Sequence, residues 1–180
     1  MKLNTNRMET LTDGIFAIVM TVMIVSLAEV MNFTAMKEQD FHKFFLSLGD
    51  DFISYAVSFL ILGFLWFEHH WQFHFIKHID PILVFLHILL FMFICLIPFL
   101  TVLAGNHPQF LAPILAFEIN ILIVCALLYA SWAYATHRRR LVEPSLDKKI
   151  ISNHNMIGLS LIIVTLVAIG VSTLLAALKA

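Results

Sequence analysis

Five stretches of apolar residues, each long enough to cross a lipid bilayer, constrain this chain more than any other feature. A helix needs about 20 such residues to span the hydrocarbon core. The stretches that reach this length are residues 11–31, 52–74, 81–103, 110–136 and 156–178. Because backbone inside a membrane must satisfy its hydrogen bonds internally, we expect an all-α integral membrane protein, with residues 1–180 in a single transmembrane domain.

The composition argues against several classes of soluble protein. Hydrophobic residues make up 61% of the 180 residues and charged residues 13%, whereas about 25% of a soluble domain is charged. The 11 Lys and Arg residues nearly balance the 12 Asp and Glu residues, so there is no basic surplus for nucleic acid. We therefore expect no water-soluble enzyme, no nucleic-acid partner and no disordered chain.

The basic residues predict the direction of the spans, because Lys and Arg concentrate in cytoplasmic loops. A cytoplasmic N-terminus places most of them on the inner side: Lys2, Arg7, Lys77, Arg138, Arg139, Arg140, Lys148 and Lys149. The outer side then holds Lys37, Lys43 and Lys179. Five spans would leave the C-terminus outside. Residues 32–51 between the first two spans fit either an interfacial helix or an extension of the second span.

The first span has two distinct faces. An apolar stripe with a Glu at its outer end follows helical steps of four and three residues: Leu11, Ile15, Ile18, Val22, Val25 and Glu29. Small residues form a second stripe: Gly14, Ala17, Thr21 and Ala28. Small side chains let helices approach closely, so we expect the second stripe to pack against a neighbouring helix. The carboxylate of Glu29 argues against lipid contact for the first stripe.

Polar residues at the start of this span allow two interpretations. Arg7 can extend to the lipid headgroups, but Asp13 lies inside the apolar run. Either Thr12 or Asp13 caps the helix, or Arg7, Thr12 and Asp13 form a polar network with the second span.

The order of these residues resembles the prokaryotic members of the transmembrane protein 175 potassium channel family. That family has the signature Arg-x-x-x-Phe-Ser-Asp, and this chain has Arg7, then Leu11-Thr12-Asp13, which keeps the hydroxyl. The sequence from Ser54 to Leu60, followed by Trp66 and His69-His70, and the run Ile97-Pro98-Phe99 add to the resemblance. It extends from Arg7 to about Arg138.

The resemblance implies a homotetrameric potassium channel in the plasma membrane of a prokaryote, with five to six helices per subunit. The first helices would line the pore, so residues 1–180 would form one channel domain. No carbonyl filter of the Thr-Val-Gly-Tyr-Gly type occurs here. Six spans are usual in the family, whereas five are found in this sequence.

The resemblance also implies roles for individual residues. Ile18, five residues after the signature Asp, would form the narrowest ring, which Val22 and Val25 continue. Thr21 would provide a hydroxyl ring beside it that aids selectivity, and Glu29 would attract cations to the outer mouth. A signature network would hold the start of the helix in place: Arg7, Leu11, Thr12, Asp13, Trp66 and His70.

The histidines of the second span leave alternatives open. His69, His70, His74 and His78 fit a belt at the inner membrane interface better than a haem or metal site. Glu118 within the fourth span is a candidate functional residue, but we expect it to hydrogen-bond to a neighbouring helix or to stay protonated. A proton-coupled small transporter is the alternative function, and a haem- or metal-binding membrane enzyme is a less favoured one. We predict no catalytic residues, cofactor or metal, and expect only potassium ions, lipid and other subunits as partners.

Overall fold

The computed structural model describes the backbone of residues 5–30 and 38–179, and the side chains of residues 5–25, 49 and 52–179. Five α-helices and one short 3₁₀ helix follow one another: α1 (Thr5–Val30), α2 (Glu38–Phe75), α3 (Pro81–Asn106), α4 (Leu111–Thr136), η1 (His137–Arg139) and α5 (Lys148–Lys179). Within these residues, five helices are long and apolar enough to cross a membrane. The predicted all-α membrane fold is therefore confirmed.

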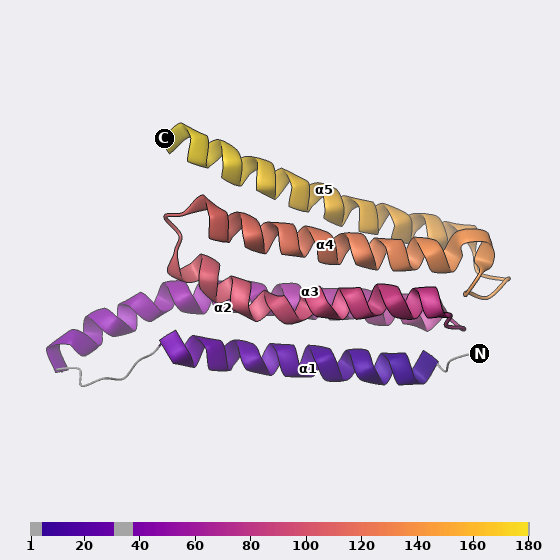
Figure 1. Cartoon of the computed structure of the whole chain (residues 1–180), viewed down its shortest axis with the longest axis horizontal. Helices are drawn as coiled ribbons and strands as arrows, with labels where there is room; N and C mark the ends of the chain where they lie inside the picture. The colour runs from indigo at the N-terminus through magenta and orange to yellow at the C-terminus, as the bar shows by residue number, and fades with distance from the viewer. Residues whose placement is uncertain (1–4, 31–37, 180) are drawn as a thin grey trace.

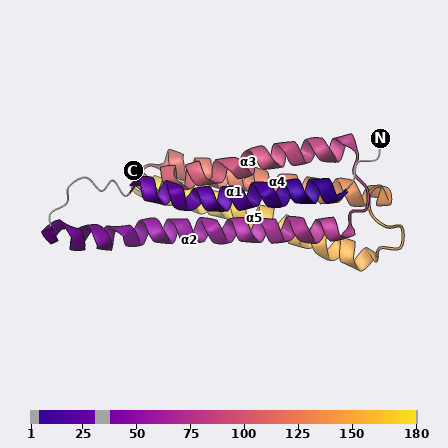
Figure 2. The same ribbon diagram turned by 90° about the horizontal axis from the view of Figure 1, so that it is seen from below.

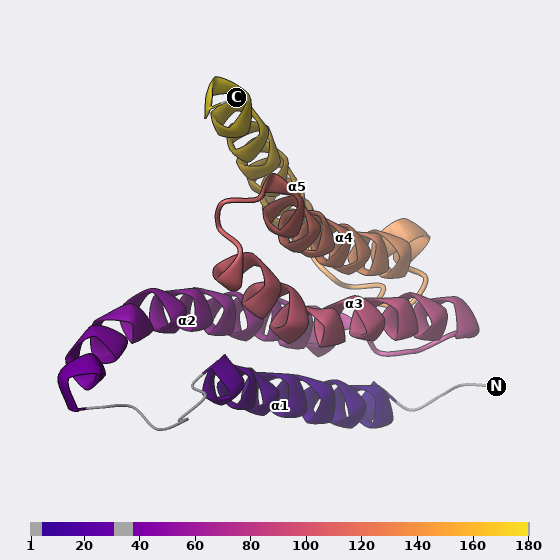
Figure 3. The ribbon, with the colours of Figure 1, turned by 60° about the vertical axis from the view of Figure 1, so that its left-hand side comes forward.

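The helices form layers with α1 on one side and α5 on the other (Figure 1). Helix α1 packs against α2 and α3, as the view from below also shows (Figure 2). On the opposite side of α3 lies α4, and α5 packs against α4 (Figure 3). The first helix is thus peripheral within a single subunit, and one of its sides remains uncovered.

Helix α2 is longer than a bilayer requires. It begins at Glu38 and runs without a break to Phe75, so the segment before Phe52 extends the second span rather than forming a separate interfacial helix. At 1.5 Å per residue its 38 residues reach about 57 Å, whereas the hydrocarbon core is about 30 Å thick.

The interior of the subunit is filled by large side chains from four helices. Phe16, Leu62, Ile94 and Trp132 are all fully buried. Helix α5 contributes far less, because most of its side chains are exposed. Exposed aliphatic residues are stable there, since lipid tails are as apolar as the side chains themselves.

Hydrogen bonds join the two connections at the N-terminal end of the bundle. The carboxylate of Asp80 accepts a bond from the Leu83 N–H at 2.9 Å and so caps α3. Its other oxygen accepts a bond from the Tyr134 hydroxyl of α4. The Lys77 N–H donates to the Leu141 carbonyl at 2.8 Å. The α2–α3 and α4–α5 connections are therefore held together.

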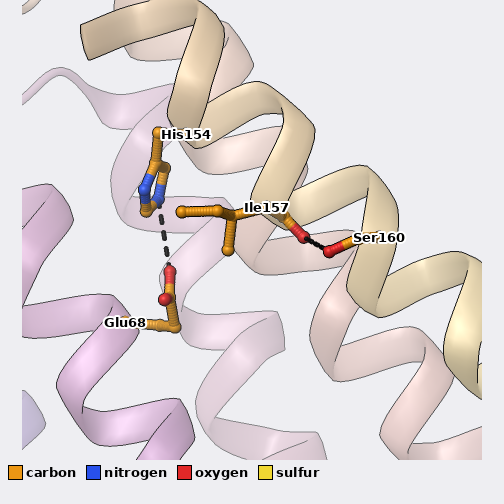
Figure 4. Close-up of polar contacts among 4 residues, drawn as sticks. All are labelled: Glu68, His154, Ile157 and Ser160. Atoms are coloured by element: carbon orange, nitrogen blue, oxygen red, sulfur yellow. Dashed lines mark hydrogen bonds and ion pairs between the residues drawn. The ribbon is translucent and has the colours of Figure 1, made fainter.

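One polar contact ties α5 to α2. Nε2 of His154 lies 3.4 Å from a carboxylate oxygen of Glu68 (Figure 4). The imidazole of His154 also stacks on the Trp71 ring at 4.2 Å between centroids. Both members of the pair are largely shielded from solvent, so the contact joins α5 to α2 in the interior, while α5 packs mainly on α4.

Candidate pore-lining helix

One face of α1 forms its contact with the rest of the subunit. Met8, Thr12, Phe16, Val19 and Met23 are buried there, at steps of three and four residues. This spacing keeps them on one side of a helix. The contact with α2 and α3 therefore determines which residues of α1 point away from the subunit.

The predicted apolar stripe lies mainly on a flank of α1, about 100° around the helix from the buried face. Ile18 is 63% exposed and Val25 is 55% exposed, and Leu11 and Val22 are exposed as well. Ile15 is the exception, because it is half-buried against the core. The side chain of Glu29 falls outside the described residues. Within one subunit, the stripe is thus a continuous apolar surface over about four turns of helix.

Three small residues of α1 face away from α2 and α3, and the side chain of Ala28, the fourth of the stripe, lies outside the described residues. Gly14, Ala17 and Thr21 are exposed. A Cβ added at Gly14 would meet no described atom within 4 Å. Within the described residues of one subunit this stripe packs against no other helix, because α2 and α3 occupy the Phe16 side. Its expected contact with a neighbouring helix therefore stays a prediction. The Thr21 hydroxyl donates to the Ile18 carbonyl of its own helix at 2.8 Å.

A hydrogen bond connects the start of α1 to α2. The indole Nε1 of Trp66 donates to Oδ1 of Asp13 at 2.8 Å, and the Trp66 ring stacks on His70 at 5.6 Å. Thr12 is buried, and its hydroxyl donates to the Met8 carbonyl at 2.9 Å. Because α1 begins at Thr5, neither Thr12 nor Asp13 caps it. Between the two alternatives, the geometry favours a network with the second span.

Two residues of the predicted network lie outside it in a single subunit. Arg7 and Leu11 are exposed. In the described part of the chain, no hydrogen bond or ion pair connects the Arg7 guanidinium to Asp13. Both side chains point outward because the inward positions of this helix belong to Met8 and Thr12.

His69 is a member of this site that sequence reasoning assigned only to a histidine cluster. Its Nε2 lies 3.4 Å from the Thr12 hydroxyl, and its ring meets the His87 ring of α3 edge-on at 5.1 Å. No sequence pattern marked this position, because apolar residues occur on every side of this part of the helix. His69 falls on the same helical face as Leu62, Leu65 and Phe73, which are all buried.

The remaining histidines of the predicted cluster are not buried. His70, His74 and His78 are exposed. Across residues 5–30 and 38–179, no three His, Cys, Asp or Glu residues are grouped in a way that could hold a metal ion. Glu118 accepts a hydrogen bond of 2.7 Å from Ser172 of α5. This is the expected hydrogen bond to a neighbouring helix.

Comparisons with known proteins agree with the resemblance. Residues 7–98 match the family described as endosomal/lysosomal potassium channel TMEM175. A protein of Streptomyces collinus named as a potassium channel is 28% identical over 150 residues, which cover 79% of this chain and 70% of that protein. A protein of Chamaesiphon minutus, also named as a potassium channel, is 24% identical over 147 residues, which cover 80% of this chain and 72% of that protein.

A chicken protein and a solved structure extend the comparison. The chicken protein, named endosomal/lysosomal proton channel TMEM175, is 33% identical over 98 residues, which cover 51% of this chain and 19% of that protein. The crystal structure of a lysosomal potassium-selective channel TMEM175 homologue from Chamaesiphon minutus superposes with a TM-score of 0.77. It covers 94% of this chain and 87% of the other at 21% identity, so the two share a fold. Since the family match covers just over half of the residues, this multi-pass membrane protein belongs to the TMEM175 family and is an ion channel, not an enzyme.

Proposed function

We propose that this protein is a potassium-selective channel in which the α1 helices of four subunits surround the path of the ion. The observation that supports this most directly is the exposed stripe of Ile18, Val22 and Val25, on the flank of α1 beside the face that packs on α2 and α3. The exposed Gly14 and Ala17 beside it would let copies of α1 approach one another closely. Such an arrangement accounts for both surfaces of the helix.

The proposed constriction is an apolar ring at Ile18. Four branched side chains that meet around an axis exclude water and close a pore by dewetting. Val22 and Val25 extend the same apolar wall along the path. Opening then requires the rings to separate far enough for a partly hydrated cation.

The proposed preference for potassium rests on weak interactions rather than on tight coordination. An apolar ring binds no ion strongly, so selectivity should be lower than that of a carbonyl filter. Hydroxyls at Thr21 would provide polar contacts next to the ring, and Glu29 would concentrate cations at the outer mouth. Two bacterial relatives are named as potassium channels, whereas the animal relatives are named as proton channels. Protons are therefore the competing ion.

The proposed location is the plasma membrane of a prokaryote, with the N-terminus in the cytoplasm. In the structure the N-terminal end of α1 lies on the same side as the α2–α3 and α4–α5 connections (Figure 1). Those connections hold Lys77, Arg138, Arg139 and Arg140, which supports a cytoplasmic assignment of this side.

The test is electrical recording of the purified protein in planar bilayers under opposed potassium and sodium gradients. We expect unitary currents whose reversal potential is shifted from zero toward the potassium equilibrium potential. The purified particle should have four times the 20.6 kDa mass of one chain. Reversal at zero would contradict potassium selectivity. Proton flux into vesicles with a pH-sensitive dye tests the competing ion. Saturable flux without unitary currents would favour the proton-coupled transporter.

A further inference from the structure

A cleft of about 600 Å³ lies between α2, α4 and α5, and its described lining contains no residue of α1. Its walls are almost entirely apolar, with Leu60 and Phe64 from α2, Ile121 from α4 and Leu161 from α5. Sites for small molecules have volumes of about 300–1,000 Å³ and mainly apolar walls with few polar groups. The cleft has the size and surface of such a site.

Glu118 supplies the carboxylate in this wall, and one of its oxygens lacks a donor. Oε1 accepts the 2.7 Å hydrogen bond from Ser172. Oε2 is shielded from solvent and accepts no hydrogen bond from any side chain or backbone group that the structure describes. The Thr165 hydroxyl in the same wall donates to the Leu161 carbonyl of its own helix at 2.8 Å. The wall of the cleft therefore contains an acceptor that the described residues do not satisfy.

We propose that this cleft binds a compact lipophilic amine, with its hydrocarbon body against the apolar walls and its ammonium group on Glu118. An ammonium provides both the missing donor and the opposite charge, and charge-assisted hydrogen bonds are the strong ones. The last torsion of a Glu side chain is broad, so the carboxylate can turn to bring Oε2 toward the cleft, and this turn exchanges the Ser172 bond to Oε1 for a bond from the ammonium. An acyl chain would fill the same volume but leave this oxygen without a donor.

The position of Glu118 along α4 separates such an amine from a phospholipid headgroup. Glu118 is the eighth residue of α4, which places it about 10 Å along the helix from its first residue. Headgroup amines lie at the membrane interface, beyond the hydrocarbon core. The charge complement of Glu118 must therefore belong to a molecule small enough to dissolve within the bilayer.

The test measures binding of radiolabelled 1-adamantylamine to the full chain in nanodiscs of phosphatidylcholine and phosphatidylglycerol. The neutral adamantan-1-ol competes as the matched uncharged probe. We expect saturable binding of the amine and competition by the alcohol that is weaker by about tenfold or more. Binding is read without ion flow, so the result is independent of the proposed conduction path.

Matched variants separate the charge from the volume of the cleft. Glu118→Gln should weaken amine binding by about tenfold or more, whereas Glu143→Gln, in an exposed loop, should not change it. Ala168→Phe, which fills the cleft, should abolish binding. Ala177→Phe, on the exposed surface of the same helix, is its control.

Three results would overturn the proposal. Equal affinity of wild type and Glu118→Gln would show that the carboxylate has no role. Equal competition by the amine and the alcohol would show a site for apolar molecules in general. Unchanged binding in Ala168→Phe, with the variant folded as judged by its thermal unfolding, would place the amine elsewhere.

Discussion

The indole nitrogen of Trp66 donates a 2.8 Å hydrogen bond to the carboxylate of Asp13 and so joins α2 to the first helix. Asp13 directly follows Thr12, the buried hydroxyl that lies 3.4 Å from His69. The two contacts come from adjacent residues of α1 and from the same turn of α2. Together they fix the rotation of α1 and hence the side chains that it presents outward.

Removing the Trp66 donor should weaken the contact between α1 and α2 and so lower the stability of the protein. Trp66→Phe keeps an aromatic ring but leaves Asp13 without its partner, so we expect a loss of about 1 kcal/mol in the free energy of unfolding. Thermal unfolding in detergent measures it. Phe67→Leu, at an exposed neighbouring aromatic residue, is the control and should change little. An equal effect of both substitutions would argue that only ring packing matters here.

Thr12 and Thr10 form a matched pair that tests the buried hydroxyl. Each donates to the carbonyl four residues earlier, but Thr12 is buried beside His69 and Thr10 is exposed. Thr12→Val should destabilise the protein by about 1 kcal/mol, because His69 loses its polar neighbour in the interior. Thr10→Val should be nearly neutral. If the two variants unfold at the same temperature, the contact with His69 contributes nothing to stability.

The proposed constriction predicts a leaky channel when Ile18 becomes polar. Ile18→Asn should let water enter the ring and raise the basal current about tenfold. Such an increase requires the free-energy barrier to ion passage to fall by only about 1.4 kcal/mol. Recordings in planar bilayers measure this current. Ile163→Asn, at a similarly exposed isoleucine on α5, is the control. Wild-type current from Ile18→Asn would argue against Ile18 as the narrowest point.

Two isoleucines of α3 test how packing stabilises this bundle. Ile94 is fully buried and Ile88 is 56% exposed. Ile94→Ala should lower the free energy of unfolding by about 2 kcal/mol, because the cavity removes dispersion contacts even where lipid replaces water. Ile88→Ala should cost much less. Thermal unfolding of the two variants in detergent measures both losses of stability. Similar losses would indicate that Ile88 is covered by another subunit.

The His154–Glu68 contact predicts a coupled pair of substitutions. His154→Phe preserves an aromatic ring against Trp71 but removes the nitrogen near Glu68, so we expect a loss of about 1 kcal/mol or more. Adding Glu68→Leu should recover part of it, because replacing both polar partners is tolerated better than removing one. A double-mutant cycle in detergent measures the coupling. Additive effects would show that the two side chains act separately.

The sequence by itself determined the class of this protein. Apolar stretches of the required length specified an all-helical membrane fold, because each crossing needs about 20 apolar residues in a hydrogen-bonded helix. The signature from Arg7 to Asp13 indicated the family, which the match over residues 7–98 confirms. The steps of three and four residues also separated an Ile/Val stripe on the first helix from its other side. Its role in a pore remains a prediction.

The tertiary structure decided which neighbours point inward. His69 and His70 are adjacent, yet the first is buried against Thr12 while the second lies outside against Trp66. Adjacent residues differ by about 100° around a helix, and a helix that is apolar on every side gives no sign of its own rotation. Contacts with other helices set that rotation. They also left the small-residue stripe of α1 uncovered and Glu118 beside a cleft, which no pattern along the chain predicts.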